Sequence, residues 1–274
     1  MKLASPITLS GSLSLHPVGL GAAMHNAAYA ALGLAWTYVP FAIEREHLPA
    51  ALAGMRALGI RGFGVSMPFK LDVLPLLDRI DPLAAKIGAV NTIVNDDGTL
   101  IGHNTDAVGA SRALEEAIGP LTGKRCLVLG AGGAARAVAF GLDARGARVT
   151  LSSRDDARAE LLAAEVGVSV LSWRRARVLD CELEVVVNAS SAGMDQGDGP
   201  SPSPIDHAAI SPNVTVMDIV YRPLETAFYC AARDRGARAV RGDRMLLFQA
   251  AAQHELYTGG PAPLAAMDKA LSNA

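Results

Sequence analysis

The sequence predicts an α/β protein, in which strands and helices alternate as in a layer of parallel strands. Short runs rich in Val, Ile and Leu alternate with longer Ala- and Leu-rich runs, which is the pattern of strand–helix–strand units. A glycine-rich segment, GAGGAARA, follows the apolar run CLVL directly, as a phosphate-binding turn follows its strand. The length of 274 residues is enough for one large or two ordinary domains.

Composition and charge exclude several classes of protein. Half of the residues are hydrophobic and 19% are charged, so the chain can bury a sizeable core and disorder is not expected. The net charge of −2 gives no reason to expect nucleic acid or an anionic membrane as a partner. Cys126, Cys181 and Cys230 are far apart and form no metal-binding motif, which is typical of a reducing compartment. Without a visible signal peptide or membrane span, we expect a cytoplasmic protein.

The first part of the chain is predicted to alternate between strands and helices. Gly33 and Gly59 end the first two helices, because glycine readily adopts the left-handed conformation of a helix C-terminus. Pro68 ends the third strand, since proline cannot donate to a sheet ladder. The predicted strands cover residues 3–15, 35–43, 60–67 and 89–95, and the predicted helices cover residues 22–33, 45–58 and 71–80.

Four polar residues stand at strand ends or turns in this part: Ser66, Lys70, Asn91 and Asp106. In an α/β layer the ends of the strands are where sites form, so these side chains are candidate site residues. Taken alone, Lys70 is better explained as a surface lysine paired with Asp72 or Asp106, because most lysines are exposed.

The second part begins with a predicted helix over residues 106–118 and a buried strand over residues 125–129. Gly130, Gly132 and Ala135 then fill the G-x-G-x-x-A pattern of a dinucleotide-binding turn. The first glycine allows the turn, the second lets a pyrophosphate approach the backbone, and the small third residue lets helix and strand pack closely. The helix N-terminus adds free N–H groups and the positive end of a dipole.

The end of the next predicted strand, residues 148–152, favours NADP over NAD. A cofactor without a 2′-phosphate requires Asp or Glu here, whereas the chain has Ser153 and Arg154, with Arg158 one turn later. Two guanidinium groups suit a 2′-phosphate, which arginine binds through paired hydrogen bonds. Two aspartates after Arg154 add negative charge, and the alternative is an ordinary charged helix start.

The rest of the chain is predicted to continue the alternation. A loop rich in Gly, Ser and Pro, residues 195–204, separates two further strands. Tyr221 follows the second of them, and Gln249 is a polar residue on an otherwise packed helix. The predicted strands cover residues 184–188 and 214–220, and the predicted helices cover residues 225–235 and 241–257.

Six ordered motifs resemble those of the shikimate dehydrogenase family over nearly the whole chain. The family pattern runs from a strand ending in Pro-x-Lys through GAVNT, G-x-NTD and GAGGAARA to D-x-x-Y-x-P-x-x-T and G-x-x-M-L-x-x-Q-A. In this chain the motifs are Met67–Lys70, Gly88–Thr92, Gly102–Asp106, Gly130–Ala137, Asp218–Thr226 and Gly242–Ala250.

The resemblance implies an NADP-dependent oxidoreductase that converts shikimate to 3-dehydroshikimate, or acts on a closely related cyclic hydroxy-acid, in the chorismate pathway to the aromatic amino acids. It implies a substrate domain, residues 1–106, a Rossmann-type NADP-binding domain, residues 107–242, and a C-terminal helix, residues 243–274, that returns to the first domain. The alternatives are a quinate or aminoshikimate oxidoreductase, or a non-enzymatic NADP-binding regulator. We expect a monomer or a homodimer.

The resemblance also assigns the site residues. Lys70 and Asp106 form the acid/base pair, with Asp106 mainly orienting Lys70 and binding the substrate hydroxyl. The expected substrate contacts are Ser66, Asn91, Tyr221 and Gln249. The expected NADP contacts are Gly130, Ala131, Gly132, Gly133, Ala134, Ser153, Arg154, Arg158, Ile219 and Gly242.

Two departures from the family pattern stand near the substrate residues. The family holds the substrate carboxylate with a Ser-x-Ser pair shortly before a His, and counted back from the His-Asn pair it falls on Gly19 and Gly21. Ser12 and Ser14 do form a Ser-x-Ser pair, but earlier in the chain, and both assignments stay open. The family's Asn-Val-Thr strand end reads Gly-Val-Ser here, at residues 64–66. The chain therefore looks closer to the divergent shikimate dehydrogenase-like branch.

Overall fold

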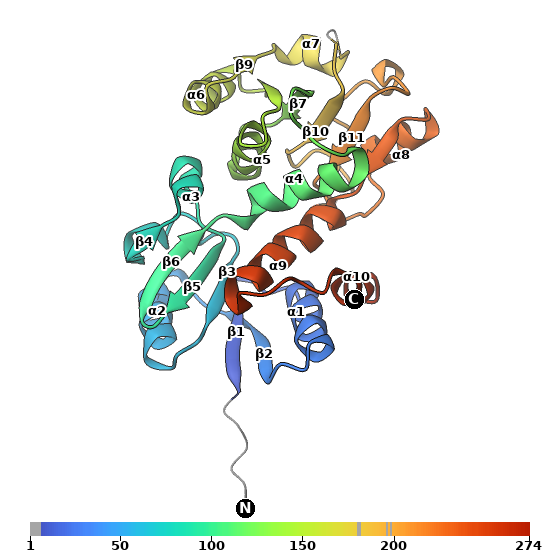
Figure 1. Ribbon diagram of the computed structural model, residues 1–274. Helices are drawn as coiled ribbons and strands as arrows, with labels where there is room; N and C mark the ends of the chain where they lie inside the picture. Colours follow the sequence, from blue (N-terminus) through green and yellow to red (C-terminus); the bar gives the residue numbers. More distant parts are fainter. Residues whose placement is uncertain (1–6, 180–181, 196, 198) are drawn as a thin grey trace, which may run out of the picture. The chain divides into compact units, whose positions relative to one another are not determined.

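Two compact units make up the part of the chain that the computed structural model describes, residues 7–179, 182–195, 197 and 199–274 (Figure 1). The first unit runs up to Thr105 and resumes with Gln249–Ala274, and the second is Asp106–Phe248. Cys181 and the first residues of the strand predicted at residues 3–15 lie outside the described residues. Each unit contains a six-stranded sheet.

A mixed sheet forms the centre of the first unit. Its strands are β1 (Thr8–Ser14), β2 (Trp36–Ala42), β3 (Gly62–Val65), β4 (Arg79–Ile80), β5 (Thr92–Asp96) and β6 (Thr99–His103). They lie in the order β2-β1-β3-β5-β6-β4, and β1, β2 and β3 are parallel. β5 runs antiparallel to both β3 and β6. The parallel half follows from two strand–helix–strand units, which need a helical crossover between neighbouring strands.

Helices connect and cover these strands. They are α1 (Leu20–Ala31), α2 (Leu48–Ala57), α3 (Pro82–Ile87), α10 (Leu264–Ser272) and the C-terminal part of α9 (Gly242–Thr258), with the short 3-10 helices η1 (Arg45–His47) and η2 (Leu74–Leu76). α10 packs against α1, so the C-terminal segment is part of the first unit (Figure 1).

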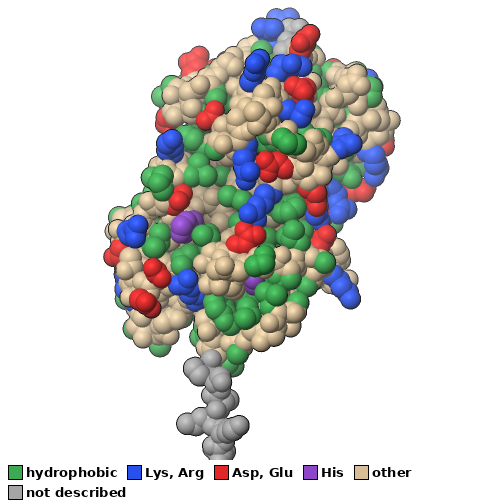
Figure 2. Space-filling model, in the orientation of Figure 1, with side chains coloured by type: hydrophobic (Ala, Val, Ile, Leu, Met, Phe, Trp, Pro, Cys, Tyr) green, Lys and Arg blue, Asp and Glu red, His purple; other side chains and the backbone are tan. Residues whose placement is uncertain are grey.

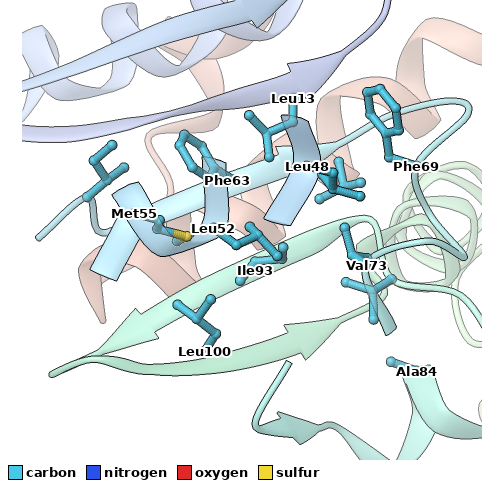
Figure 3. Close-up of a cluster of buried hydrophobic side chains, with 13 residues drawn as sticks. Leu13, Leu48, Leu52, Met55, Phe63, Phe69, Val73, Ala84, Ile93 and Leu100 are labelled. Carbon is cyan, nitrogen blue, oxygen red and sulfur yellow. The ribbon is translucent and has the colours of Figure 1, made fainter. Parts of the chain in front are cut away.

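The first unit has a hydrophobic cluster on each face of its sheet. One cluster packs the buried side of α2 against Phe63 and Ile93 (Figure 3). The other packs Tyr29 and Tyr257 against Val94. Ile93 and Val94 are neighbours in β5, and successive strand side chains point to opposite faces. Each fully buried side chain of this size contributes about 1.5–3 kcal/mol, so both layers hold the sheet in place.

The helix predicted at residues 71–80 is wrong. That segment forms turns, η2 and β4, and the helix begins later, at α3. Asp81 caps α3 by accepting the Leu83 N–H at 2.9 Å, and Pro82 takes the first helical position. Proline tolerates that position because its missing N–H would have no partner there, so the Asp-Pro pair was the true start signal.

The alternation of strands and helices predicted a parallel layer in the first unit, but one strand of its sheet runs antiparallel to its neighbours. β5 and β6 form an antiparallel hairpin whose turn is Asp97 and Gly98, with φ of 47° and 90°. Asp-Gly suits this turn because both central residues need positive φ. Asn91 lies just before β5, although the strand predicted at residues 89–95 included it.

The second unit has a parallel sheet in the order β12-β11-β10-β7-β8-β9. Its strands are β7 (Arg125–Leu129), β8 (Arg148–Ser152), β9 (Ser169–Val170), β10 (Val185–Asn188), β11 (Thr215–Asp218) and β12 (Arg238–Val240). Its helices are α4 (Thr105–Ile118), α5 (Gly133–Asp143), α6 (Asp156–Val166), α7 (Trp173–Arg177), α8 (Ala227–Asp234) and the first part of α9, with η3 (His207–Ala209). This is the strand order of the Rossmann fold, so the Rossmann-type domain predicted from the glycine pattern is confirmed.

The surface carries charges of both signs. Acidic and basic side chains are interspersed on the face shown in Figure 2. Within the described residues, no helix is long and apolar enough to cross a membrane. The net charge of −2 therefore arises from mixed charges and not from an acidic block on this face.

Candidate active site

Asn91 is the centre of a buried hydrogen-bond network in the first unit. Its side-chain Oδ1 accepts the backbone N–H of Thr105 at 2.7 Å and the hydroxyl of Thr92 at 2.8 Å. Its Nδ2 donates to Gln249 Oε1 at 3.3 Å and to Thr105 Oγ1 at 3.0 Å. Because a backbone N–H can only donate, it fixes which end of the amide is the oxygen. Two predicted substrate residues, Asn91 and Gln249, are thus brought together.

Ser66 and Lys70 follow β3. Ser66 is exposed, and its backbone N–H donates to the Leu13 carbonyl oxygen at 3.0 Å. Lys70 lies within the turn at residues 67–73 and is half-buried. Its carbonyl oxygen accepts the Val90 N–H at 2.9 Å. Val90 precedes Asn91, so the backbone of Lys70 lies beside the Asn91 network.

Asp106 is the second residue of α4 and is half-buried. It stands in the first turn, where the helix dipole favours a negative charge. Thr105, which precedes it, donates its N–H to Asn91. Asp106 is therefore the next residue in the chain after a member of the Asn91 network.

Three members of this network were missed by the sequence prediction: Thr92, Thr105 and Gln253. Thr92 and Thr105 lie inside the GAVNT and G-x-NTD motifs, but the motifs do not show that their hydroxyls meet. In the structure those two hydroxyl oxygens are 3.1 Å apart. Gln253 donates to Thr92 Oγ1, also at 3.1 Å. Its spacing of four residues from Gln249, on one helix face, was a signal that could have found it.

The turn after β7 has the backbone geometry of a phosphate cradle. Gly130 has φ of +126°, which favours glycine. A Cβ on Gly130 would also lie 2.8 Å from the carbonyl oxygen of Ala189, just beyond β10. β7 and β10 are the two neighbouring strands at which the order of this sheet reverses, and nucleotides bind at that point in such sheets. Ala131 connects Gly130 to the start of the next helix.

The N-terminus of α5 supplies the donors for this cradle. Gly132 is its N-cap, and the first hydrogen bond runs from the Arg136 N–H to the Gly132 carbonyl oxygen. The N–H groups of Gly133, Ala134 and the residue after them therefore have no intrahelical acceptor. Nothing lies within 4 Å of where a Cβ on Gly132 or Gly133 would stand, so a pyrophosphate can approach the backbone. These residues fit a dinucleotide.

The predicted 2′-phosphate residues follow β8. Ser153 is half-buried, and Arg154 and Arg158 are exposed. Asp155 is the N-cap of α6, with its Oδ1 accepting the Arg158 N–H at 3.1 Å. Its other oxygen lies 3.2 Å from Arg158 Nε. The negative charge of Asp155, which would disfavour a nearby phosphate, is thus engaged in a helix cap and an ion pair with Arg158.

A buried carboxyl group, Asp218, joins three segments at the carboxyl edge of the second sheet. It accepts hydrogen bonds from Thr226 Oγ1 at 2.6 Å, Asn188 Nδ2 at 2.9 Å and the Val220 N–H at 3.1 Å. Burial raises the pKa of Asp218 to about 6, although these hydrogen bonds act in the opposite direction. Asp218 therefore holds the segment that leaves β11.

That segment carries Ile219 and Tyr221, which were predicted to contact cofactor and substrate. Ile219 is half-buried and Tyr221 is exposed. Gly242 begins α9, and a Cβ there would lie 2.5 Å from the Ile219 carbonyl oxygen. Glycine is thus required where the two backbones meet, and the structure brings Ile219 and Gly242 together.

Known proteins are similar to this chain in sequence. A family model described as the shikimate dehydrogenase substrate binding domain matches residues 5–93. The shikimate dehydrogenase (NADP(+)) of Moorella thermoacetica is 46% identical over 270 residues, which cover 94% of this chain and 91% of that protein. The chain belongs to the shikimate dehydrogenase family.

Solved structures of similar proteins agree with this assignment. Shikimate 5-dehydrogenase from Thermus thermophilus, in complex with NADP(H) and shikimate, has a TM-score of 0.88 and 36% identity, covering 97% of this chain and 99% of that one. Quinate dehydrogenase from Corynebacterium glutamicum, in complex with NAD, has a TM-score of 0.89 and 30% identity, covering 98% and 99%. The predictions of the family and of the fold class are confirmed.

Asp218→Asn is expected to change how the stability of the second unit depends on pH. The pKa of Asp218 is raised from 3.8 to about 6, so the folded form keeps a proton that the unfolded chain loses in this window. The free energy of unfolding therefore falls as the pH rises from about 4 to 6, by roughly 3 kcal/mol. Asparagine cannot ionise, so the variant gains that amount over the wild type between pH 4 and pH 7.

Urea unfolding followed by the fluorescence of Trp173 measures this difference. Trp173 lies in α7 of the second unit, and a Trp36→Phe background removes the signal of the first unit. A difference between variant and wild type that stays constant with pH would show that Asp218 does not titrate in this range.

Proposed function

We propose that this chain is an NADP-dependent dehydrogenase that interconverts shikimate and 3-dehydroshikimate. The observation that carries the proposal is the hydrogen bond that joins two predicted substrate residues, Asn91 and Gln249, in a chain that also has a dinucleotide cradle. The relative from Moorella thermoacetica is named for the same activity and cofactor, and the predicted enzyme class and cofactor agree with it. We further propose that the chain acts in the chorismate pathway, in the cytoplasm, as a monomer or homodimer.

Oxidation of a ring hydroxyl removes a hydride from carbon and a proton from oxygen. NADP⁺, when bound, supplies the hydride acceptor. Lys70 takes the hydroxyl proton in this direction and returns it from its ammonium group in the reverse direction. Asp106 accepts a hydrogen bond from the substrate hydroxyl and orients Lys70. Each residue lies beside the Asn91 network, through the Val90–Lys70 hydrogen bond and through Thr105.

Gln249 and Asn91 are proposed to bind the other hydroxyls of the ring. Gln249 Oε1 already accepts from Asn91 Nδ2, so Gln249 Nε2 is the atom that can donate to the substrate. The hydroxyls of Ser66 and Tyr221 complete the set, since both side chains are exposed. Such polar groups reject analogues that lack the matching hydroxyl.

Quinate is the second candidate substrate, because a quinate dehydrogenase has nearly the same fold. The two substrates are cyclic hydroxy-acids that the same polar residues could hold. Steady-state kinetics with shikimate and quinate, each with NADP⁺ and NAD⁺, separate the two functions. A higher kcat/KM for quinate than for shikimate would replace the main proposal.

Lys70→Ala is expected to lower kcat by at least about a hundredfold, since general acid–base catalysis typically contributes 10²–10⁴-fold. The KM for NADP⁺ should change little. Lys86→Ala is the matched control, because Lys86 lies in the last turn of α3 and is exposed. If Lys70→Ala keeps the wild-type kcat, the proposed proton transfer is wrong.

Arg154→Ala is expected to weaken NADP⁺ binding by roughly 1–3 kcal/mol, the cost of losing a charged hydrogen-bond partner, while NAD⁺ binding barely changes. Isothermal titration with each cofactor measures both. Arg148→Ala is the control. Arg148 is an exposed arginine at the start of β8, whereas Arg154 follows the end of that strand. Equal losses for the two cofactors would remove the 2′-phosphate role from Arg154.

The substrate carboxylate also needs a binding group. Of the two serines that could bind it, Ser12 and Ser14, we favour Ser14. Ser14 Oγ is buried and has no hydrogen-bond partner among the described residues. A buried hydroxyl without a partner costs about 1–3 kcal/mol, which a ligand can recover. The Ser12 hydroxyl is already hydrogen-bonded to Tyr38.

The position of Ser14 as the last residue of β1 supports it as well. Ser10, Ser12 and Ser14 point to the same face of β1, and Ser10 bonds the Tyr29 hydroxyl of α1 at 2.7 Å. Ser14 therefore faces the layer that α1 forms, at the strand end from which the chain enters that helix. Gly19 is the N-cap of α1 and adds backbone N–H groups from its first turn.

Ser14→Ala is expected to raise the KM for shikimate more than tenfold, about 1.4 kcal/mol, with little change in kcat. Ser12→Ala is the control and should stay within threefold of the wild type. Gly19→Ser tests the other assignment, since nothing lies within 4 Å of a Cβ there and φ is −68°. An unchanged KM in Ser14→Ala, together with a lower KM in Gly19→Ser, would move the carboxylate to the glycine segment.

A further inference from the structure

Gln253 is a buried amide on α9, one turn beyond Gln249, and only 5% of its surface is exposed. Gly64 of β3 makes room for it. A Cβ on Gly64 would lie 3.3 Å from Gln253 Nε2 and 2.9 Å from the Tyr38 hydroxyl. Glutamine is mostly exposed in proteins, so an amide held at this depth by a glycine opposite it needs a physical reason.

Backbone geometry fixes the orientation of the Gln253 amide. Its Nε2 faces the carbonyl oxygen of Asn91 at 3.4 Å, and a carbonyl oxygen can only accept. Its Oε1 therefore faces His25 Nε2, at 3.2 Å, and His25 must carry its proton on that nitrogen. Burial lowers the pKa of His25 to about 3, so the ring is neutral at the pH of catalysis.

From Gln253, the hydrogen bonds lead to the residues proposed to bind the substrate. Gln253 Nε2 also donates to Thr92 Oγ1 at 3.1 Å, which directs the hydroxyl proton of Thr92 to Asn91 Oδ1 at 2.8 Å. The Thr105 N–H donates to the same oxygen. With Oδ1 engaged by two donors, Asn91 presents its Nδ2 to Gln249.

We propose that Gln253 is a positioning residue, which orients the Thr92 hydroxyl and through it the amides of Asn91 and Gln249 for the substrate. The inference rests on the proposed function, in which Asn91 and Gln249 bind shikimate. Gln253 acts through Thr92 and Asn91 and needs no contact with the substrate. Groups held in place beforehand need not reorient when the substrate binds, so both binding and turnover gain.

Gln253→Met tests this role. Methionine is unbranched and similar in size, so it removes the hydrogen bonds while leaving little cavity. We expect kcat/KM for shikimate to fall at least tenfold, with a higher KM, while the KM for NADP⁺ stays within twofold. Tyr257→Phe is the matched control, because Tyr257 is buried on the same helix and its hydroxyl has no hydrogen-bond partner among the described residues. Its kcat/KM should stay within twofold of the wild type.

A second background separates positioning from a general structural effect. If Gln253 acts through Asn91, adding Gln253→Met to Asn91→Ala lowers kcat/KM by less than a further twofold. A tenfold loss in both backgrounds, or no loss in either, overturns the proposal. If Gln253→Met does not fold, Gln253→Glu replaces it in the same comparison, since it keeps an acceptor toward His25 and loses the amide donor.

Asn91→Ala alone distinguishes a failure of the proposed substrate residues from a failure of the proposed role of Gln253. An unchanged kcat/KM in that variant removes Asn91 from the substrate site, and the proposed assignment of residues fails with it. A large loss in Asn91→Ala, with no effect of Gln253→Met, overturns only the role of Gln253.

Discussion

The hydrogen bond from the Thr105 N–H to Asn91 Oδ1 is the constraint on which the rest of the candidate site depends. Asn91 and Thr105 flank the open end of the β5–β6 hairpin, where Thr92 pairs with His103. The Asp97–Gly98 turn closes the other end and sets the register. A slip of one residue would point alternate side chains to the opposite face, so the turn at the far end of the hairpin decides which side chains meet around Asn91.

The second unit also has a buried side chain that accepts a backbone N–H at a strand end, but this side chain can ionise. Asp218 ends a strand and accepts a backbone N–H, as Asn91 does beside β5. Asn91 cannot ionise, so its network keeps one pattern of donors and acceptors at every pH. The pKa of Asp218 is raised to about 6 by burial, so the segment after β11 is held by a group that can change charge. A buried amide gives a constant geometry where a buried acid does not.

The parts of this protein that the sequence predicted are those set by local pattern. The turn of Gly130 and the start of α5 follow from a strand, a glycine spacing and a helix within a few residues. The β5–β6 hairpin was not predicted, although Asp97 and Gly98 form a dipeptide that is typical of such turns. Gln253 was missed for a different reason: it bonds Thr92, which is 161 residues away, and no local pattern encodes that contact.

Burial gives the two units opposite responses to acid. The pKa of His25 is lowered to about 3, so the folded first unit binds fewer protons than the unfolded chain, and its stability falls as the pH drops below 6.5. Asp218 acts in the other direction, because its raised pKa favours the folded second unit as the pH falls from 6 to 4. The two contributions partly cancel in any measurement that averages over the whole chain. Mild acid therefore lowers the contribution of His25 to the stability of the first unit and raises that of Asp218 to the stability of the second.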